Sequence, residues 1–226
     1  MTLAPLVESG AVVGFFVGDE LFPGKISLSD FTTCIRALQK FKDSHAALKL
    51  VTWENEGSTG WVKDFAKDGI PDELDVISMD DYYMWDWNNE TDVDTNDDTP
   101  QKQVDGHRRF YEQKIYPLLK PHQRVFIVPG SFATRDSRPA SAVKGYPLGN
   151  RTYCYNGTAS GCDSYMAAQA RAYGAWAMED PLVSGLFPWH WDSREIGITT
   201  PYKEVGVVDM PKTKSAWREI GAKLGE

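Results

Sequence analysis

The sequence predicts an α/β fold in which about five parallel strands alternate with helices. Short apolar runs recur along the chain, and each is followed by a segment whose apolar residues repeat at helical spacing. The 226 residues suit one large domain or two small ones, and 42% of them are hydrophobic, as is ordinary for a globular protein. No apolar run approaches the about 20 residues that span a bilayer, so we expect no transmembrane helix.

The first predicted strand is Ala11–Val17, a continuous apolar run that is typical of a strand buried on both faces. Four more strands are expected, and they lie at Leu48–Trp53, Leu74–Met79, Arg124–Val128 and Val183–Trp189. Because consecutive strands are separated by helical segments, we expect parallel pairing with right-handed crossovers.

Helices are predicted between the strands from apolar residues that share one face. Ser27 and Asp30 form a capping box at the start of the first helix. Its apolar face contains Phe31, Cys34, Ile35, Leu38 and Phe41, and Cys34 is expected to be a small buried residue. The later helices are expected at Trp61–Phe65, Val104–Leu118, Tyr165–Met178 and Trp217–Leu224.

The charge balance narrows the classes of partner. Asp and Glu outnumber Lys and Arg by 32 to 24, which gives a net charge of −8 and argues against a protein that binds nucleic-acid phosphates. No Gly-rich phosphate loop and no G-x-S-x-G elbow follows a strand, so we expect no nucleotide cofactor and no esterase site. A neutral substrate suits this composition, and no membrane or nucleic-acid partner is expected.

No metal site is expected, although one acidic segment leaves an alternative open. No second histidine stands at ligand spacing from His190. Within Asp86–Asp98 the acidic side chains have the alternate spacing of a calcium loop, but the Gly and Glu of such a loop are replaced by Asp97 and Gln103. A solvated acidic loop is favoured over a weak calcium site.

Cysteines and glycosylation sequons point to the secretory pathway. Cys154 and Cys162 bracket a turn-rich loop, and a disulfide between them, favoured over two free thiols, would contribute about 2–3 kcal/mol. Three Asn-x-Ser/Thr sequons lie in predicted loops, at Asn89, Asn150 and Asn156. The first residues lack the basic and apolar regions of a signal peptide, so secretion is favoured only if a further N-terminal segment precedes them.

Polar and aromatic side chains follow the predicted strands, where parallel α/β folds form their binding sites. Asp19 and Glu20 follow the first strand. The other positions are Trp53-Glu54-Asn55-Glu56 at the second strand, Asp80-Asp81-Tyr82-Tyr83 after the third, Ser131 after the fourth and Trp189-His190-Trp191-Asp192 at the fifth. These residues are the candidates for a functional site.

The segment Val12–Glu20 resembles the fourth strand of the (β/α)8 glycoside hydrolases of clan A, which ends in Asn-Glu with the Glu as acid/base. Asp19 stands at the position of that Asn, and Glu20 matches the Glu. Asp75–Tyr83 looks like the sixth strand, and Val183–Trp191 looks like the eighth, whose final aromatic residue floors the sugar site. The resemblance implies that residues 1–226 form one partial TIM-barrel-like (β/α) domain without the first three units.

The chain departs from that family in two ways: five units cannot close an eight-stranded barrel, and the seventh strand lacks its carboxylate. Arg124–Val128 would be the seventh strand, which carries a nucleophilic Glu in the family, but Pro129-Gly130-Ser131 follows it here. Chitinase-like barrels also end their fourth strand in a catalytic Glu and use the substrate's acetamido group instead of a nucleophile. Most of their preceding Asp residues are missing from this chain, so that resemblance ranks second.

The candidate roles follow from the two-carboxylate chemistry of glycosidases. Glu20 is the candidate proton donor, and burial against an aromatic side chain such as Phe16 or Trp189 would keep it protonated. Asp80 or Asp81 is the candidate second carboxylate. Its separation from the Glu20 carboxylate would be about 5–5.5 Å for a nucleophile and about 6.5–9.5 Å for an inverting base. An equally favoured alternative is that Glu20 and Asp80 only form structural ion pairs with Lys or Arg side chains.

Aromatic side chains that suit the C–H faces of sugars accompany these carboxylates. The candidate substrate-binding residues are Asp19, Trp53, Glu54, Asn55, Tyr82, Tyr83, Trp189, His190 and Trp191. Two functions remain open, a glycoside hydrolase and a non-catalytic carbohydrate-binding or scaffold protein. If no unit precedes it, the strand at Val12–Val17 forms an open edge, through which we expect self-association.

Overall fold

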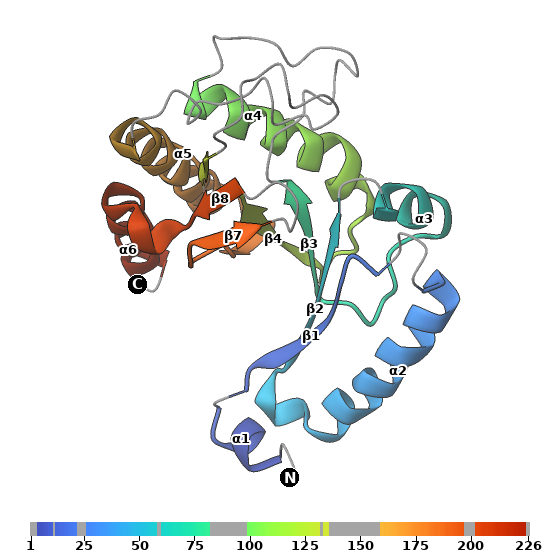
Figure 1. Ribbon diagram of the computed structural model, residues 1–226. Coiled ribbons are helices and arrows are strands. Elements are labelled where there is room, and N and C mark those ends of the chain that lie inside the picture. The colour runs from blue at the N-terminus through green and yellow to red at the C-terminus, as the bar shows by residue number, and fades with distance from the viewer. Residues whose placement is uncertain are drawn as a thin grey trace. The chain divides into compact units, whose positions relative to one another are not determined.

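The computed structural model describes residues 4–10, 12–21, 26–57, 60–81, 99–131, 133–135, 159–196 and 202–224 (Figure 1). The described residues form two compact units. The first contains those within Met1–Asp80, Glu112–Ile127 and Leu182–Gly185, and the second contains those within Asp81–Tyr111, Val128–Pro181 and Leu186–Glu226.

A five-stranded parallel sheet, which belongs mainly to the first unit, confirms the predicted fold class. Its strands stand in the order β1 (Gly14–Asp19), β2 (Val51–Gly57), β3 (Val76–Asp81), β4 (Arg124–Pro129) and β6 (Val183–Leu186). The parallel register pairs Asp19 with Asn55, and Asn55 with Ser78. The ends of β1, β2 and β3 therefore meet at one edge of the sheet.

The predicted burial of the first strand on both faces is wrong. Val13 and Phe16 are 71% and 54% exposed, because β1 stands at the end of the described sheet with β2 as its neighbour. Apolar side chains on an edge strand invite pairing with another chain. Self-association through this edge stays a prediction.

The second strand is displaced from its predicted position. Leu48 ends a 3₁₀ turn (η1, Ala46–Leu48), and β2 continues through Glu54, Asn55 and Glu56 to Gly57. All three of these polar residues are buried. The sequence pattern placed them beyond the strand because an extended segment is expected to end where charged residues begin.

Two of the three α-helices described in the first unit follow the prediction, and the short first one was not predicted. They are α1 (Ala4–Glu8), α2 (Leu28–Ser44) and α3 (Gly60–Asp68), followed later by a π-helical turn (Tyr111–Ile115) and a 3₁₀ turn (Tyr116–Leu118). Ser27 caps α2 by accepting a hydrogen bond from the Asp30 amide at 3.1 Å. Cys34 is exposed, so its predicted burial is wrong: the fully buried side chains of α2 are those of Phe31 and Ile35.

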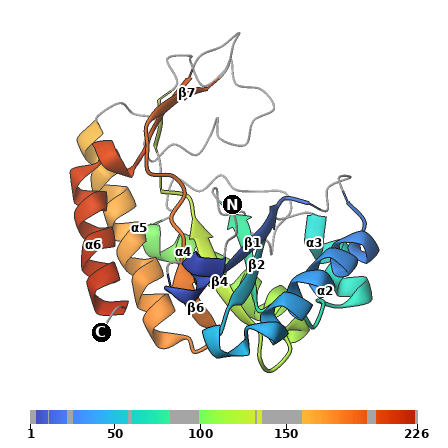
Figure 2. The ribbon, with the colours of Figure 1, turned by 90° about the horizontal axis from the view of Figure 1, so that it is seen from below.

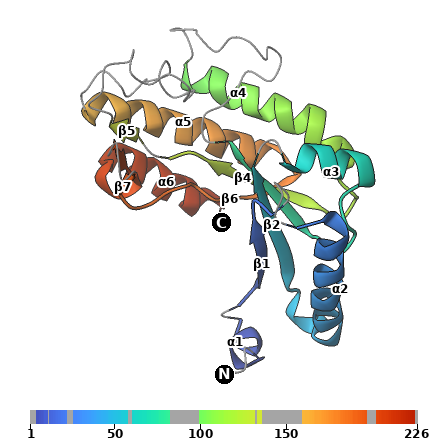
Figure 3. The same cartoon turned by 45° about the vertical axis from the view of Figure 1, so that its right-hand side comes forward.

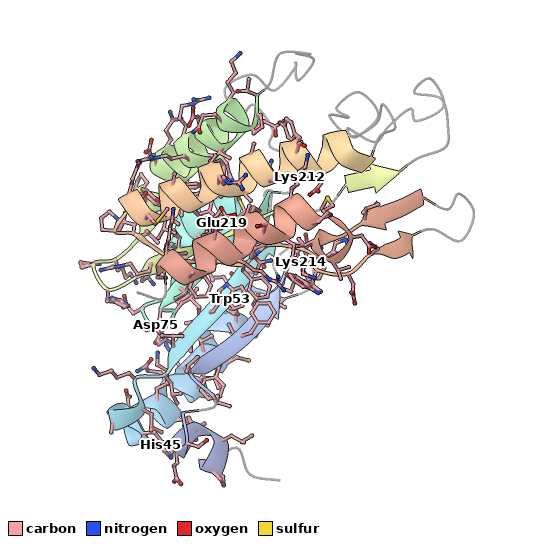
Figure 4. All side chains as sticks on the ribbon, turned by 90° about the vertical axis from the view of Figure 1, so that its left-hand side faces the viewer. His45, Trp53, Asp75, Lys212, Lys214 and Glu219 are labelled. Atoms are coloured by element: carbon pink, nitrogen blue, oxygen red, sulfur yellow. The ribbon has the colours of Figure 1, made fainter. Side chains whose placement is uncertain are left out.

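A polar cluster ties α2 to the amino-terminal ends of β2 and β3. Thr52 donates its hydroxyl to the Glu73 carbonyl at 2.7 Å and its amide to the Asp75 carboxylate at 2.7 Å. Lys42 of α2 forms an ion pair with the same carboxylate. Figure 4 labels Asp75 and Trp53, which belong to this amino-terminal region and to β2.

The second unit contains three main helices and a small sheet. The helices are α4 (Pro100–Phe110), α5 (Ala159–Glu179) and α6 (Pro211–Leu224), and a 3₁₀ turn spans Val207–Asp209. The predicted helix at Val104–Leu118 is therefore α4 followed by the π-helical and 3₁₀ turns. The three-stranded antiparallel sheet of β5 (Ala133–Arg135), β8 (Tyr202–Val205) and β7 (Arg194–Ile196) was not predicted, because its strands are only three or four residues long.

The helices of the second unit pack closely. Figure 2 shows α5 and α6 side by side, and Figure 3 shows α4 alongside α5. A Cβ atom added to Gly174 would lie 2.7 Å from a side-chain atom of Ile220, so the glycine permits the close approach of α5 and α6. Between α4 and α5, the buried His107 ring lies 2.9 Å from the Tyr173 hydroxyl.

Several predictions fall outside the described residues. They concern Cys154, the acidic segment Asp86–Asp98 and the sequons at Asn89, Asn150 and Asn156, and nothing is described of the Cys162 side chain. The disulfide and glycosylation stay predictions. In the part of the chain that the structure describes, no helix is long and apolar enough to cross a membrane.

Candidate functional site

An aromatic row crosses the sheet of the first unit. The ring centroids of Phe16 on β1 and Trp53 on β2 lie 4.5 Å apart. The ring centroids of Trp53 and Phe126, which is on β4 beyond β2 in the strand order, lie 5.2 Å apart. Side chains in a strand alternate between the two faces, so Trp53 and Asn55 share a face of β2. The aromatic row thus lies one layer below Asn55 on that face.

A polar row forms the next layer, toward the carboxyl ends of the strands. The Asn55 side-chain amide donates to Asp19 Oδ1 at 2.8 Å, and the Ser78 hydroxyl donates to Asn55 Oδ1 at 2.6 Å. The Trp53 indole donates to the Ser78 oxygen at 2.6 Å and so joins the two rows. Three of the predicted site residues, Asp19, Trp53 and Asn55, are therefore brought together.

Glu20 stands beside this row, at the point where β1 ends. Its amide donates to the Asn55 carbonyl at 2.9 Å, and its φ of +47° lies in the left-handed region that non-glycine residues seldom adopt. Its Oε1 atom lies 2.7 Å from the position that a Cβ on Gly57 would occupy. Glu20 is exposed, so its expected burial against an aromatic ring is wrong.

Glu54 and Glu56 lie inside β2 and are completely buried. Strand alternation places both of them on the face opposite Asn55. Glu54 is thus separated by the sheet from Asp19 and Trp53, which were expected to share its role as substrate ligands. Glu56 follows Asn55 directly in β2, and no role was assigned to it from the sequence.

The third strand supplies Ser78 and ends in the two candidate aspartates. The backbone of Asp80 pairs with Gly57, one position beyond Glu56, which puts Asp80 at the carboxyl end of the strand next to β2. The side chains of Asp80 and Asp81, together with Tyr82 and Tyr83, lie outside the described residues. Their predicted roles therefore stay predictions.

Trp189, His190 and Trp191 belong to the second unit. Trp189 forms a parallel bridge with Gly130, and its peptide bond to His190 is cis. The His190 ring is buried, whereas Trp191 is half exposed and has the Lys214 ammonium 5.3 Å from its ring centroid. Within this unit, Trp191 offers an accessible aromatic face next to a cation.

The described residues contain no group of three or more His, Cys, Asp or Glu side chains that could hold a metal ion. In the polar row, Asn55 and Ser78 are buried and hydrogen-bonded to each other, and the exposed Asp19 carboxylate is the member that can accept a hydrogen bond from a polar ligand. Its chemistry fits the recognition of hydroxyl groups beside an apolar face, because the aromatic row lies one layer away.

Sequence reasoning missed Ser78 and Gly57. Ser78 is a small polar residue within a buried apolar strand, and its position in the register became meaningful only once β2 was seen to continue to Gly57. Gly57 was not singled out, because it follows three polar residues beyond the end of the predicted strand. A polar residue two positions before Asp80 on the same predicted strand was the available signal for Ser78, since such residues share a face.

No family model matches this chain, and no curated protein matches it. Among solved structures, a GH113 beta-1,4-mannanase has 16% sequence identity and a TM-score of 0.42 over 92% of this chain and 56% of that chain. A complex of a GH113 beta-1,4-mannanase has 16% identity and a TM-score of 0.40, with 97% and 61% coverage of the two chains.

A beta-glucuronidase from Ruminococcus gnavus has 11% identity and a TM-score of 0.40, and the match covers 96% of this chain and 37% of that chain. The chain thus spans less than two thirds of the length of each of these structures. At these identities and TM-scores, no residue role is transferred from them.

Proposed function

We propose that this chain binds a carbohydrate at the carboxyl ends of β1, β2 and β3 and takes part in the hydrolysis of its glycosidic bond. The observation that carries the proposal is the pair of layers on one face of the sheet: Asp19, Asn55 and Ser78 joined by hydrogen bonds, next to the aromatic row of Phe16, Trp53 and Phe126. Sugars present hydroxyl groups and apolar C–H faces, and these two layers complement both.

Glu20 is the proposed proton donor to the leaving oxygen. Its carboxylate is exposed at the end of β1, beside the polar row. Its left-handed backbone supports a functional role, because strained conformations of non-glycine residues concentrate at active sites. Asp80 or Asp81 is the proposed second carboxylate, which acts as a nucleophile or as a base for water, according to its separation from Glu20.

Glu56 is a rival for the role of proton donor. It is completely buried and lies in β2 directly after Asn55. Its place on the opposite face of β2 from Asn55 favours Glu20. The two assignments predict different losses of activity and are separable by one pair of variants.

A non-catalytic carbohydrate-binding protein is the second candidate. The favouring observation is the end of β4, where Pro129, Gly130 and Ser131 stand without a carboxylate. A binding protein needs the polar and aromatic layers but neither a proton donor nor a nucleophile.

The test is a screen of chromogenic glycosides with the wild type, Glu20→Gln and Glu56→Gln, with Glu73→Gln as control. Each substitution replaces a carboxylate by an amide of the same size. Glu73 precedes β3, away from the carboxyl ends of the strands, and is paired with Arg36. We expect the wild type and the Glu73→Gln control to hydrolyse a glycoside and Glu20→Gln to lose this hydrolysis. All four proteins, the wild type and the three variants, should retain oligosaccharide binding. Binding without hydrolysis by the wild type would support the second candidate, and the absence of both would refute the proposal.

A further inference from the structure

The hydrogen bonds of the polar row have a fixed direction, because the Trp53 indole at one end of the row can only donate and the Asp19 carboxylate oxygen at the other end accepts. The Trp53 indole can only donate, so the Ser78 oxygen accepts from it at 2.6 Å. The Ser78 hydrogen is then directed to Asn55 Oδ1 at 2.6 Å. The Asn55 amide nitrogen therefore faces Asp19 and donates to its Oδ1 atom at 2.8 Å.

Asn55 also holds the next residue of β1 through its backbone. The Glu20 amide donates to the Asn55 carbonyl at 2.9 Å, and the register pairs Asp19 directly with Asn55. One residue of β2 thus contacts Asp19 through its side chain and Glu20 through its main chain. Asn55 and Ser78 are buried, so water competes little for these bonds, whereas Asp19 and Glu20 are exposed.

We propose that Asn55 is a positioning residue that fixes Asp19 and Glu20, and that Ser78 and Trp53 are positioning residues that fix the Asn55 amide. The proposal rests on the proposed function, since it gives these residues a role in placing the groups that meet the sugar. Hydrogen bonds that run in one direction through a buried region reinforce one another. Loss of the Ser78 hydroxyl therefore releases the Asn55 amide to turn, and Asp19 loses its donor.

The test measures the reactivity of Asp19 in Ser78→Ala and in Trp53→Phe. Trp53→Phe keeps an aromatic ring between Phe16 and Phe126 and removes the indole N–H, so it serves if Ser78→Ala does not fold. The matched control is Thr52→Val, which also loses two buried hydroxyl contacts, to Glu73 and Asp75, at the amino end of the same strand. Each folded protein is treated with a water-soluble carbodiimide and glycine ethyl ester, and labelling of Asp19 is followed by peptide mass spectrometry.

We expect the labelling rate of Asp19 to rise severalfold in Ser78→Ala and Trp53→Phe and to stay at the wild-type value in Thr52→Val. An unchanged rate in both row variants would overturn the proposal, and so would an equal rise in Thr52→Val, which would mean general loosening of the strand.

Kinetics separate this proposal from the proposed function. If the wild type hydrolyses a glycoside, kcat falls severalfold in Ser78→Ala with KM little changed, and Thr52→Val keeps both constants. If Ser78→Ala instead retains the wild-type kcat, the positioning role is refuted. If the wild type neither binds nor hydrolyses any glycoside, the proposed function fails, and the labelling of Asp19 still decides whether Asn55, Ser78 and Trp53 position it.

Discussion

Each unit contains a cluster of buried polar side chains, and the two clusters differ in where their hydrogen bonds end. In the second unit, the Asp163 carboxylate accepts from the Thr213 amide at 2.8 Å, the Thr213 hydroxyl at 2.9 Å and the Lys212 amide at 2.9 Å. In the first unit, the bonds run from Trp53 through Ser78 and Asn55 to the exposed Asp19. We call the cluster around Asp163 the closed cluster and the cluster that ends at Asp19 the open cluster.

This is the difference that we expect between a structural use of buried polar groups and the functional use proposed for the open cluster. The closed cluster satisfies the amides at the start of α6, which would otherwise be left without partners, and it joins α6 to α5. The open cluster also stabilises its strands, but its last member is a carboxylate in contact with solvent. Burial alone does not distinguish the two uses, whereas the position of the terminal group does.

The largest expected effect is on the closed cluster. Asp163→Ala removes three hydrogen bonds and leaves the buried donors of Thr213 and the partly buried Lys212 amide without this acceptor, so we expect a loss of about 3 kcal/mol in the free energy of unfolding. Urea unfolding followed by circular dichroism measures it. Thr213→Val, which loses only the hydroxyl, should cost about 1 kcal/mol. A loss under about 0.5 kcal/mol for Asp163→Ala would contradict the structural role.

The open cluster should show a smaller loss of stability and a larger loss of binding. In Asn55→Ala, Asp19 turns to water and Ser78 retains a contact with the Glu54 carbonyl at 3.4 Å, so we expect a cost of about 1–2 kcal/mol. Oligosaccharide affinity, measured by calorimetry, should fall at least tenfold, which corresponds to about 1.4 kcal/mol. Unchanged affinity together with a stability loss as large as that of Asp163→Ala would remove the distinction between the clusters.

Two glycines extend the same comparison. Gly174→Ala would place a Cβ atom 2.7 Å from the branched side chain of Ile220, so overpacking should outweigh the gain in helix propensity by about 1 kcal/mol. In Gly57→Ala the nearest atoms to the new Cβ belong to the flexible end of Glu20, so stability should change by less than about 0.5 kcal/mol, while any hydrolysis falls.

A double variant checks the first glycine. Ile220→Ala should cost about 1 kcal/mol less in the Gly174→Ala protein than in the wild type, because the crowding is then relieved. Equal costs in both proteins would show that the helices adjust freely to the added methyl group.

The smallest expected effect concerns an exposed ion pair outside both clusters. The Lys120 ammonium hydrogen-bonds to Asp72 and holds the pKa of this carboxyl below its ordinary value. Because the pKa of Asp72 is lower in the folded protein than in the unfolded chain, the pair stabilises the fold at pH values above the unfolded pKa. This contribution is lost as the pH falls through the folded pKa. Because the pair is exposed and screened by salt, Asp72→Asn should change Tm only slightly at neutral pH.

Thermal unfolding at several pH values measures this effect. The difference in Tm between the wild type and Asp72→Asn should shrink toward zero in acid, and high salt should reduce it at neutral pH. A difference that grows as the solution is acidified would contradict the assigned sign.

The order and direction of the five strands were predictable, because apolar runs separated by helical segments constrain the connections strongly. The start of α2 was predictable too, since Ser27 and Asp30 carry a capping signature that depends on four residues alone. The exposure of Cys34 was not, because helical spacing defines a stripe but not its width. The three short strands β5, β7 and β8 carry too few residues for a periodic signal.

The candidate site was predictable in its location and only partly in its members. Asp19 and Asn55 were found because they follow apolar runs, yet their direct hydrogen bond depends on a register that includes an irregularity between Phe16 and Gly18. Such an irregularity shifts the face on which each later side chain lies, and nothing in the apolar pattern reveals it. For the same reason, the opposite orientations of Asn55 and Glu56 could not be assigned before the end of β2 was known.

The most direct test of the open cluster as a carbohydrate site is a titration followed by two-dimensional nitrogen–proton NMR. Manno-, cello-, xylo- and chito-oligosaccharides are added in turn, and three signals are monitored: the Trp53 indole N–H, the Asn55 side-chain amide and the Thr213 backbone amide. At least one sugar should shift the Trp53 and Asn55 signals in a saturable manner and leave that of Thr213 in place. Saturable binding that leaves Trp53 and Asn55 unmoved, or no binding of any of the four, would contradict the proposed site.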